Sequence, residues 1–406
     1  MEKLFQQSID DLSKLYKFSE NELKILNDVD SAAEEMAEGE FEHYIKHEIN
    51  FDALKIAKKY GLLGIPIKKE YGGLGSNHLM SVLAKERLGQ LGLGFSSFFN
   101  VQVFLGALSI QHWASEAQKE KYLKPVAQGD KIIAFALTEP EAGSEPTALK
   151  TNYEKRSNKY ILNGTKYLIT NGSIADYIIV FARSKSVQNE ISAFIVDGES
   201  TGLTRMPLRE KMGLFTSDTA MLEFKDVEVP EENIIGEIGK GIHIAYSALL
   251  NGRIGIASGC IGIIEGSLSA AIARAKERVQ HGKLIGKHQL IQRHIAEIRQ
   301  NLEMARWPTY FAAIQRAEYE KDISNKLLIN EAELRTALAK KIASRLAFES
   351  ADRAVQIFGG FGYSFLSQVG AFFCDSRVTR IYEGTDEIME LKIANMVLGE
   401  EFEAFE

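Results

Sequence analysis

The sequence predicts a mostly α-helical fold with a central antiparallel β domain. Apolar residues follow helical spacing in the first third of the chain, alternate as in strands in the middle, and return to helical spacing afterwards. With 406 residues the chain is long enough for two or three cores of common domain size. We expect one packed unit of three domains: an N-terminal helical domain over 1–130, a middle β domain over 131–239 and a C-terminal helical bundle over 240–406.

Turn and capping signals mark elements of the first two domains. Ser115 and Gln118 have the spacing of a capping box, so a helix is expected to begin there. Asn163-Gly164 separates two strand-like runs and predicts a hairpin turn, because both turn positions favour positive φ. Strands are expected near residues 132–137, 159–162, 166–170, 177–181, 191–196 and 221–227.

Two apolar stripes predict the core of the C-terminal domain. The first recurs at four-and-three spacing and the second at every fourth residue, as on the buried face of a helix. Their members are Ile291, Ile295, Ile298 and Leu302, and Leu334, Leu338, Ile342 and Leu346. We interpret both stripes as core packing rather than as cofactor contacts.

Charge and composition exclude several classes of function. The net charge is -7 and no lysine/arginine run is present, so nucleic acid and anionic membranes are not expected as main partners. The two cysteines, Cys260 and Cys374, lack the spacing of a disulfide framework or a cysteine-based zinc site. The acidic N-terminus is unlike a signal peptide, and no apolar run approaches the ~18 residues of a membrane span. We therefore expect a cytoplasmic protein without membrane insertion or a metal site, acting on a small ligand.

Two strand ends carry hydroxyl groups that suit a flat polar ligand. Thr138–Ser144 combines a proline, a glycine and two hydroxyl side chains after a strand, and Leu168–Gly172 adds Thr170 at the end of another. Such loops can bring backbone N–H groups and hydroxyls close to a ligand. From these residues alone, an ordinary turn is the favoured interpretation of the first segment, and a plain strand end suffices to explain the second.

Two further polar or glycine-rich patches lie in the helical region. One contains Arg278, Gln280, His281 and Gln289, and the other is the run from Gln356 to Gly362 with Gly359 and Gly360. The glycine pair lacks the strand-first GxGxxG context of a dinucleotide fold. A close-packing turn is therefore as good an interpretation as a pyrophosphate site.

Near the C-terminus, Glu383 lies between Tyr382 and Gly384 at an expected helix break. Apolar neighbours raise the pKa of a carboxyl group toward neutrality, which suits a general base. A surface glutamate is the alternative that these residues leave open.

Five segments together resemble the acyl-CoA dehydrogenase family over nearly the whole chain. They are TEPEAGS at 138–144, KYLITNG at 166–172, Arg278 with Gly282, QIFGGFGY at 356–363 and IYEGT at 381–385. The resemblance implies a helical N-terminal domain, a β-barrel-like middle domain and a C-terminal four-helix bundle. It also implies FAD as cofactor and an acyl-CoA thioester as substrate.

The resemblance assigns roles to named residues. The loop from Phe135 to Ser144 would lie along the flavin, with Ile169 and Thr170 on its other side and Glu383 as the base. Further flavin contacts would come from Leu137, Thr138, Gly143 and Leu168, and substrate contacts from Ser144, Arg253, Tyr382 and Gly384. Across a subunit interface, the diphosphate and adenine would meet Arg278, Gln280, His281, Gln289, Gln356, Gly359 and Gly360, with Thr385 and Glu387 near the adenosine. A homo-oligomer is therefore expected, a tetramer rather than a dimer.

The implied reaction removes two hydrogens from the acyl chain. Glu383 would take the α-proton while the β-carbon delivers hydride to flavin N5, with the thioester oxygen held by the Glu383 N–H and a ribityl hydroxyl. Some members of the family carry the base just before the arginine that corresponds to Arg253. That position is Gly252 here, so no rival carboxylate stands there.

Three departures from the family pattern bear on specificity. Leu168 stands where many members have tryptophan or phenylalanine, and His281 where phenylalanine is usual. Residues 95–102 and 143–146 are closest in wording to glutaryl-CoA dehydrogenase, yet Ser96 replaces the arginine that binds the substrate carboxylate there. A buried carboxylate without that cation is costly, so we expect a neutral short, medium or cyclic acyl group rather than a dicarboxylic one.

Several functions of the same fold stay open. An electron-transfer flavoprotein is the expected electron acceptor, and an oxidase that uses oxygen is an alternative. The thioester could be tethered to a carrier protein instead of CoA. A non-catalytic flavin-binding protective protein is a remote alternative, disfavoured by the negative charge and the intact sequence from Tyr382 to Thr385.

Overall fold

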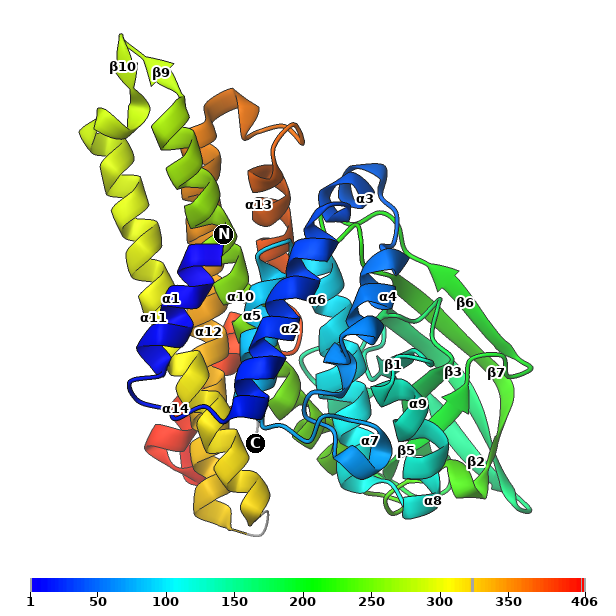
Figure 1. The fold of residues 1–406 in the computed structure, drawn as a ribbon. Helices are drawn as coiled ribbons and strands as arrows, with labels where there is room; N and C mark the ends of the chain where they lie inside the picture. The colour runs from blue at the N-terminus through cyan, green and yellow to red at the C-terminus, as the bar shows by residue number, and fades with distance from the viewer. Residues whose placement is uncertain (1, 323–324, 403, 405–406) are drawn as a thin grey trace.

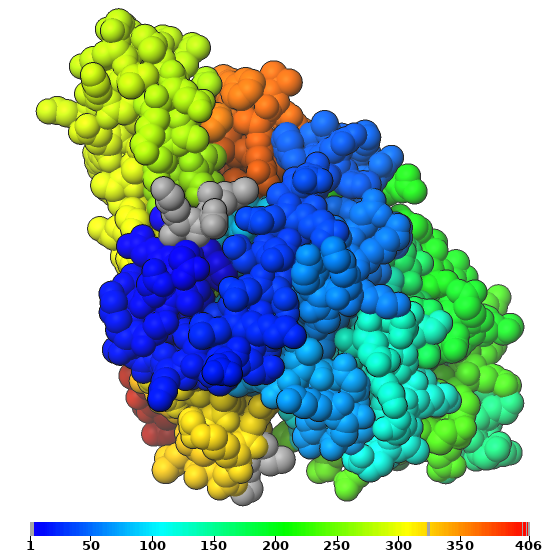
Figure 2. All heavy atoms as spheres, in the orientation of Figure 1, coloured from blue at the N-terminus to red at the C-terminus, as the bar shows by residue number. Residues whose placement is uncertain are grey.

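The computed structural model describes residues 2–322, 325–402 and 404. In Figure 1 the long C-terminal helices stand on one side, the β-sheet on the other, and the N-terminal helices between them. The space-filling view of the same face shows the N-terminal helices filling the region between these two parts (Figure 2). Mostly α with a central sheet, this arrangement confirms the predicted fold class.

The N-terminal region contains a succession of short helices. Helix α5 (His78–Gly89) is buried along its entire length, and it packs against both α2 (Glu20–Ala37) and α10 (Gly241–Glu277). The capping box at Ser115 is confirmed, because its side chain accepts a hydrogen bond from the Gln118 N–H. The other α-helices are α1 (Glu2–Leu12), α2 (Glu20–Ala37), α3 (Glu40–Lys46), α4 (Phe51–Lys59), α6 (Leu93–Phe99), α7 (Leu108–Trp113), α8 (Glu116–Gln118) and α9 (Lys124–Ala127).

Two π-helical stretches interrupt this region, η3 (Asn100–Ala107) between α6 and α7 and η4 (Lys119–Leu123) between α8 and α9. π-Helical turns are rare in proteins overall, and those that occur are often found at functional sites. The first of them leads directly into the site described below.

The middle region forms one sheet in the order β6-β7-β3-β2-β4-β5-β8, with β1 beside β4. Most pairs are antiparallel, but β4 pairs in parallel with both β1 and β2, so the sheet is mixed rather than purely antiparallel. The strands are β1 (Ile133–Ala136), β2 (Asn152–Arg156), β3 (Lys159–Thr170), β4 (Tyr177–Ser184), β5 (Ile191–Asp197), β6 (Leu203–Pro207), β7 (Thr219–Pro230) and β8 (Ile234–Ile235).

The hairpin predicted at Asn163-Gly164 is wrong, because both residues lie inside the continuous strand β3. The positive φ that the pair favours is used by a bulge against β7, where Gly164 has a φ of 145°. A Cβ at Gly164 would lie 2.5 Å from the Cα of Thr151, so close backbone approach also requires glycine. The actual turn between β2 and β3 contains Ser157, with a φ of 57°.

The C-terminal region is built on three long helices and two shorter ones. They are α10, α11 (Gln289–Lys321), α12 (Lys326–Phe358), α13 (Gln368–Val378) and α14 (Asp386–Leu398), with the small hairpin β9 (Val279–Gln280) and β10 (Lys283–Leu284) between α10 and α11. Ile298 and Leu302 are buried as predicted. The second stripe is only half-buried at Leu334, Leu338 and Ile342. Small residues such as Ala339, Ala343 and Ala347 form the buried face of α12 instead, which permits close helix packing.

Two helical stretches among the described residues are long and apolar enough to cross a membrane, Leu93–Trp113 and Gly241–Glu277. The expectation that no segment approaches that length was therefore wrong. The most apolar window of the first stretch is entirely buried inside the protein, and that of the second is 78% buried. Burial of this kind is typical of helices in the core of a large domain.

Candidate active site

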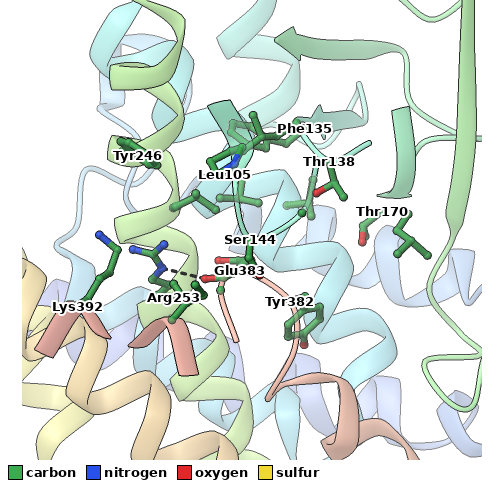
Figure 3. A pocket seen from close by; sticks show the side chains of 18 of the residues that line it. Leu105, Phe135, Thr138, Ser144, Thr170, Tyr246, Arg253, Tyr382, Glu383 and Lys392 are labelled. Atoms are coloured by element: carbon green, nitrogen blue, oxygen red, sulfur yellow. Dashed lines mark hydrogen bonds between the residues drawn. The ribbon is translucent and has the colours of Figure 1, made fainter. Parts of the chain in front are cut away.

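Glu383 lies in the turn between α13 and α14, in a backbone conformation that few residues adopt. Its φ is 54°, in the left-handed region, and Gly384 follows with a φ of 99°. Two cations hold this turn: Arg253 Nε donates to the Glu383 carbonyl at 2.9 Å, and Lys340 Nζ donates to the Gly384 carbonyl at 2.6 Å. The first of these bonds is drawn in Figure 3. Helices α10 and α12 therefore fix the backbone that presents the carboxylate.

The two carboxylate oxygens of Glu383 differ in their surroundings. Oε1 accepts a hydrogen bond from Asn100 Nδ2 at 2.5 Å, whereas Oε2 is buried without a hydrogen-bond partner among the described residues. Gly252 makes room for Oε2, since a Cβ there would lie only 2.1 Å from it. An unpaired buried oxygen is costly and calls for a functional explanation.

Burial raises the pKa of the Glu383 carboxyl group to about 7. The positive charges of Lys85, Arg253 and Lys340 oppose this shift, as does the hydrogen bond from Asn100. A carboxyl group that titrates near neutrality can both accept and release a proton at physiological pH. Glu383 thus has the property expected of a general base.

Two cavities meet at Glu383. The first has a volume of about 330 Å³, and its apolar wall comes from η3, α10 and α14. In Figure 3, Arg253 and Lys392 lie on one side of Glu383, and Thr138, Thr170 and Tyr382 lie on the other. The second cavity, of about 490 Å³, is bounded by the ends of β1 and β3, by 211–214 before β7 and by the C-terminal part of α13. The walls common to both are Thr138, Gly143, Ser144, Leu168, Thr170, Tyr382, Glu383 and Gly384.

Most of the site residues predicted in the chain's middle and at its C-terminal turn come together here. The first cavity is lined by Phe135, Leu137, Thr138, Gly143, Ser144, Leu168, Ile169, Thr170, Arg253, Tyr382, Glu383 and Gly384. Thr385 lines the second cavity and also caps α14, where its side chain accepts from the Ile388 N–H. Their individual roles remain predictions.

The remaining predicted residues do not reach either cavity in the described part of the chain. Arg278, Gln280, His281 and Gln289 are exposed on the tip that α10, α11 and the β9–β10 hairpin form (Figures 1 and 2). Gln356, Gly359 and Gly360 are exposed at the end of α12, and Glu387 is exposed on the first turn of α14. The predicted role of the two patches across a subunit interface stays a prediction.

Sequence reasoning missed several residues of the site. Asn100, Lys85 and Lys340 surround Glu383, and Met212 lines the second cavity. Asn100 was detectable as a polar residue inside the apolar run from Phe98 to Leu105. Ser96, on which the substrate argument rested, is fully buried beside Gly259 and is not in the wall of either cavity.

Family sequence models match almost the whole chain. They describe the acyl-CoA dehydrogenase N-terminal domain over residues 19–130, the middle domain over 134–227 and the C-terminal domain over 239–398. The chain belongs to the acyl-CoA dehydrogenase family. An acyl-CoA dehydrogenase of Bacillus subtilis (strain 168) is 40% identical over 87% of this chain and 91% of its own. A short-chain-specific acyl-CoA dehydrogenase of Megasphaera elsdenii is 41% identical over 81% of this chain and 85% of its own.

Solved structures of the family have the same fold. Butyryl-CoA dehydrogenase from Megasphaera elsdenii matches with a TM-score of 0.88 at 36% identity, covering 95% of this chain and 100% of that one. A glutaryl-CoA dehydrogenase with bound glutaryl-CoA matches with a TM-score of 0.89, covering 95% and 96%, but at 29% identity. The wording of residues 95–102 and 143–146 therefore does not reflect a higher identity to that subgroup over the whole chain.

Other relatives concern electron partners and cofactors. A structure reported with the electron transferring flavoprotein of Acidaminococcus fermentans contains a chain that matches with a TM-score of 0.89 at 36% identity. A caffeyl-CoA reductase–Etf complex subunit of Acetobacterium woodii is 36% identical over 94% of this chain. An acyl-CoA dehydrogenase of Bacillus anthracis, solved with FAD, matches with a TM-score of 0.87 at 32% identity and covers 94% of this chain and 67% of that one.

The second cavity of this acyl-CoA dehydrogenase family member suits a flat ligand with apolar faces and polar edges. Three large apolar side chains in its wall are half exposed, Leu168 at 55%, Met212 at 55% and Ile381 at 50%. Exposed apolar side chains that converge on one cavity indicate a ligand that covers them. Thr138, Thr170 and Ser144 offer hydroxyl groups in the same wall. These residues fit the flavin ring that family membership implies.

Proposed function

We propose that this protein catalyses the α,β-dehydrogenation of a short, neutral acyl-CoA thioester, with Glu383 as the base and FAD as the cofactor. The observation that carries this proposal is Glu383 itself, which lies in the wall of both cavities, has an Oε2 without a hydrogen-bond partner among the described residues, and has a carboxyl pKa raised to about 7. One cavity has the apolar wall that an acyl chain needs, and the other fits a flavin.

The structure supports a specific path for the α-proton. Asn100 occupies Oε1, so Oε2 is the oxygen available to accept the proton. Gly252 leaves room for that oxygen, because a Cβ there would lie 2.1 Å from it, and Arg253 Nε donates to the Glu383 carbonyl. We infer that Glu383 takes the α-proton on Oε2 while FAD, when bound, supplies the acceptor for the hydride from the β-carbon.

A thioester oxygen needs a hydrogen-bond donor, because negative charge develops on it as the α-proton leaves. Within the described residues, no hydrogen bond joins the backbone N–H of Glu383 to another backbone group. That N–H is therefore available to donate to the thioester oxygen. We infer that the left-handed backbone of Glu383 directs its N–H toward the cavity that the residue lines.

The walls of the two cavities indicate which ligand each would hold. Leu168, Met212 and Ile381 would pack on the FAD ring system, and Thr138 and Thr170 would meet its polar edge. The first cavity presents Val101, Leu105, Leu249, Ile388 and Leu391, which would pack on a bound acyl chain and exclude water from it. Its volume of about 330 Å³ lies at the small end of ligand sites, which favours a short chain, as do the short-chain relatives.

We also propose an electron-transfer flavoprotein as acceptor and a homo-oligomeric state. The relatives connected by name with electron-transferring flavoproteins support the first. The exposed patches at Arg278 and Gln356 support the second, since neither lies in the walls of the two cavities at Glu383. Light scattering after size-exclusion chromatography would measure the oligomeric state, and a monomer that retains FAD would contradict this part of the proposal.

Anaerobic bleaching of the flavin by a panel of thioesters tests the proposed function. We expect butyryl-CoA to reduce the flavin faster than palmitoyl-CoA and glutaryl-CoA. A butyryl group attached to a carrier protein, included in the same panel, tests the alternative of a carrier-bound substrate. Admission of oxygen to the reduced protein tests the alternative of an oxidase. A protein that contains FAD but is bleached by none of the thioesters would contradict the proposal.

A further inference from the structure

Lys85 is a buried lysine that has no carboxylate in hydrogen-bond contact among the described residues. It lies on α5 and is 1% exposed, and its Nζ donates to Asn100 Oδ1 and to the Gly255 carbonyl, both at 2.7 Å. A buried ammonium group that is not paired is costly, so its retention needs a reason. Burial lowers the pKa of Lys85 to about 7, while the charge of Glu383 opposes that shift.

Asn100 connects Lys85 to the carboxylate of Glu383. Its side-chain amide is oriented by its neighbours, because a lysine can only donate and a backbone carbonyl can only accept. Oδ1 therefore faces Lys85, and Nδ2 faces both the Gly252 carbonyl at 3.3 Å and Glu383 Oε1 at 2.5 Å. The result is a continuous hydrogen-bonded chain from Lys85 through Asn100 to Glu383.

Helix α10 is shaped to accommodate this chain. A Cβ at Gly252 would lie 2.1 Å from Glu383 Oε2, and a Cβ at Gly255 would lie 2.0 Å from Asn100 Oδ1. The two glycines are three residues apart and so lie on the same face of the helix. Asn100 itself is the first residue of the π-helix η3, and Val101 and Leu105 of that helix line the first cavity. Helix α10 thus leaves space for the chain formed by Lys85, Asn100 and Glu383, and η3 supplies its central member.

We propose that Lys85 and Asn100 are positioning residues that hold Oε1 of Glu383, reserve Oε2 for the α-proton and favour the ionised carboxylate. This inference rests on the proposed role of Glu383 as base. It adds that α5, which contributes no residue to either cavity wall, controls the base through a single amide.

The other charged and titratable groups around Glu383 act differently. Arg253 from α10 and Lys340 from α12 bind backbone carbonyls of the turn, at Glu383 and Gly384, rather than the carboxylate. Tyr382 adjoins Glu383, and its own pKa is raised well above the ordinary value by burial. Cys260 faces Lys85, and burial raises the pKa of its thiol to about 11, so it stays neutral near pH 7. Asn100 alone therefore donates to the carboxylate among the described residues.

Two variants separate this role from general stability. Lys85→Met removes the charge and the donor, whereas Asn100→Asp keeps the size and the acceptor for Lys85 but places a carboxylate against Oε1. Both changes favour the protonated form of Glu383, so its pKa should rise by about 1 unit or more. Ser96→Ala is the matched control, because the Ser96 hydroxyl is buried nearby without a hydrogen-bond partner among the described residues.

The first measurement is the pH midpoint of flavin reduction. The second is an infrared titration of the carboxyl C=O band of Glu383, which is identified by its absence in Glu383→Gln. The infrared band reports protonation without turnover. We expect both midpoints to move upward in Lys85→Met and Asn100→Asp and to stay at the wild-type value in Ser96→Ala. Midpoints in folded Lys85→Met that match wild type would overturn the inference, and if that variant does not fold, Asn100→Asp decides alone by the same criterion. Flavin reduction by Glu383→Gln at the wild-type rate would instead overturn the proposed function.

Discussion

The turn around Glu383 and the tip around Arg278 were equally prominent in the sequence, but the structure treats them differently. At the turn, Glu383 and Gly384 are held by partners from α10, α12 and η3, and two cavities converge on them. At the tip, Arg278, Gln280 and His281 are exposed, and they are not in the walls of the two cavities at Glu383. One chain therefore contains the residues of the proposed chemistry, whereas we propose that the tip becomes a site only against a second subunit.

The largest effect on the rate of flavin reduction is expected from Gly252→Ala, because this substitution displaces the side chain of Glu383 in the turn. The new Cβ would meet Glu383 Oε2 at 2.1 Å, so the carboxylate must move. A displacement of about 1 Å can lower the rate by about a hundredfold. Rapid-mixing measurement of flavin reduction gives the rate, and FAD content and melting temperature serve as controls. A reduction rate close to that of wild type would show that the position of Oε2 is not critical.

A smaller effect, on the cofactor rather than the chemistry, is expected at the tip. Arg278→Ala should weaken FAD retention and oligomer formation, because a cation at this place would bind a diphosphate from a neighbouring subunit. Lys287→Ala is the matched control, since Lys287 is exposed on the same tip but was assigned no role. FAD dissociation after dilution is the measurement. Equal FAD retention in the two variants would remove the tip from the cofactor site.

The pH dependence of flavin reduction should depend on the turn around Glu383 and not on the tip around Arg278. The pKa of Glu383 is raised to about 7 by burial, and only the ionised carboxylate can accept a proton. The rate should therefore increase with pH through about 7 and level off above it, and Arg278→Ala should share this midpoint. A profile that is flat from pH 5.5 to 8.5 would place the titration of the base elsewhere.

The smallest expected effect is on stability. A glutamate whose pKa is higher in the folded than in the unfolded state stabilises the protein fully only below its ordinary value, and this contribution is lost as pH rises to about 7. Glu383→Gln lacks this loss. Its melting temperature relative to wild type should therefore be higher at pH 8 than at pH 5, by a few degrees. A difference that does not change with pH would contradict burial as the cause of the raised pKa.

The overall fold and most residues of the turn could be predicted from the sequence, because motifs and apolar periodicity reflect local backbone conformation and burial. Glu383, Thr138 and Thr170 are in or beside strand ends and turns that local patterns reveal. The hairpin at Asn163-Gly164 was wrong because a bulge inside β3 uses the same positive φ as a turn. Lys85 was missed because its partner Asn100 becomes its neighbour only when α5 and η3 both pack against α10.

We propose that Glu383 takes the α-proton, and exchange of that proton with solvent reports on this step alone. Anaerobic incubation of the enzyme with butyryl-CoA in D₂O, followed by NMR of the α-position, measures the exchange apart from the later fate of the electrons. We expect wild type to exchange the α-proton and Glu383→Gln, with FAD still bound, to exchange it at least about a hundredfold more slowly. Equal exchange by the two proteins would contradict the account.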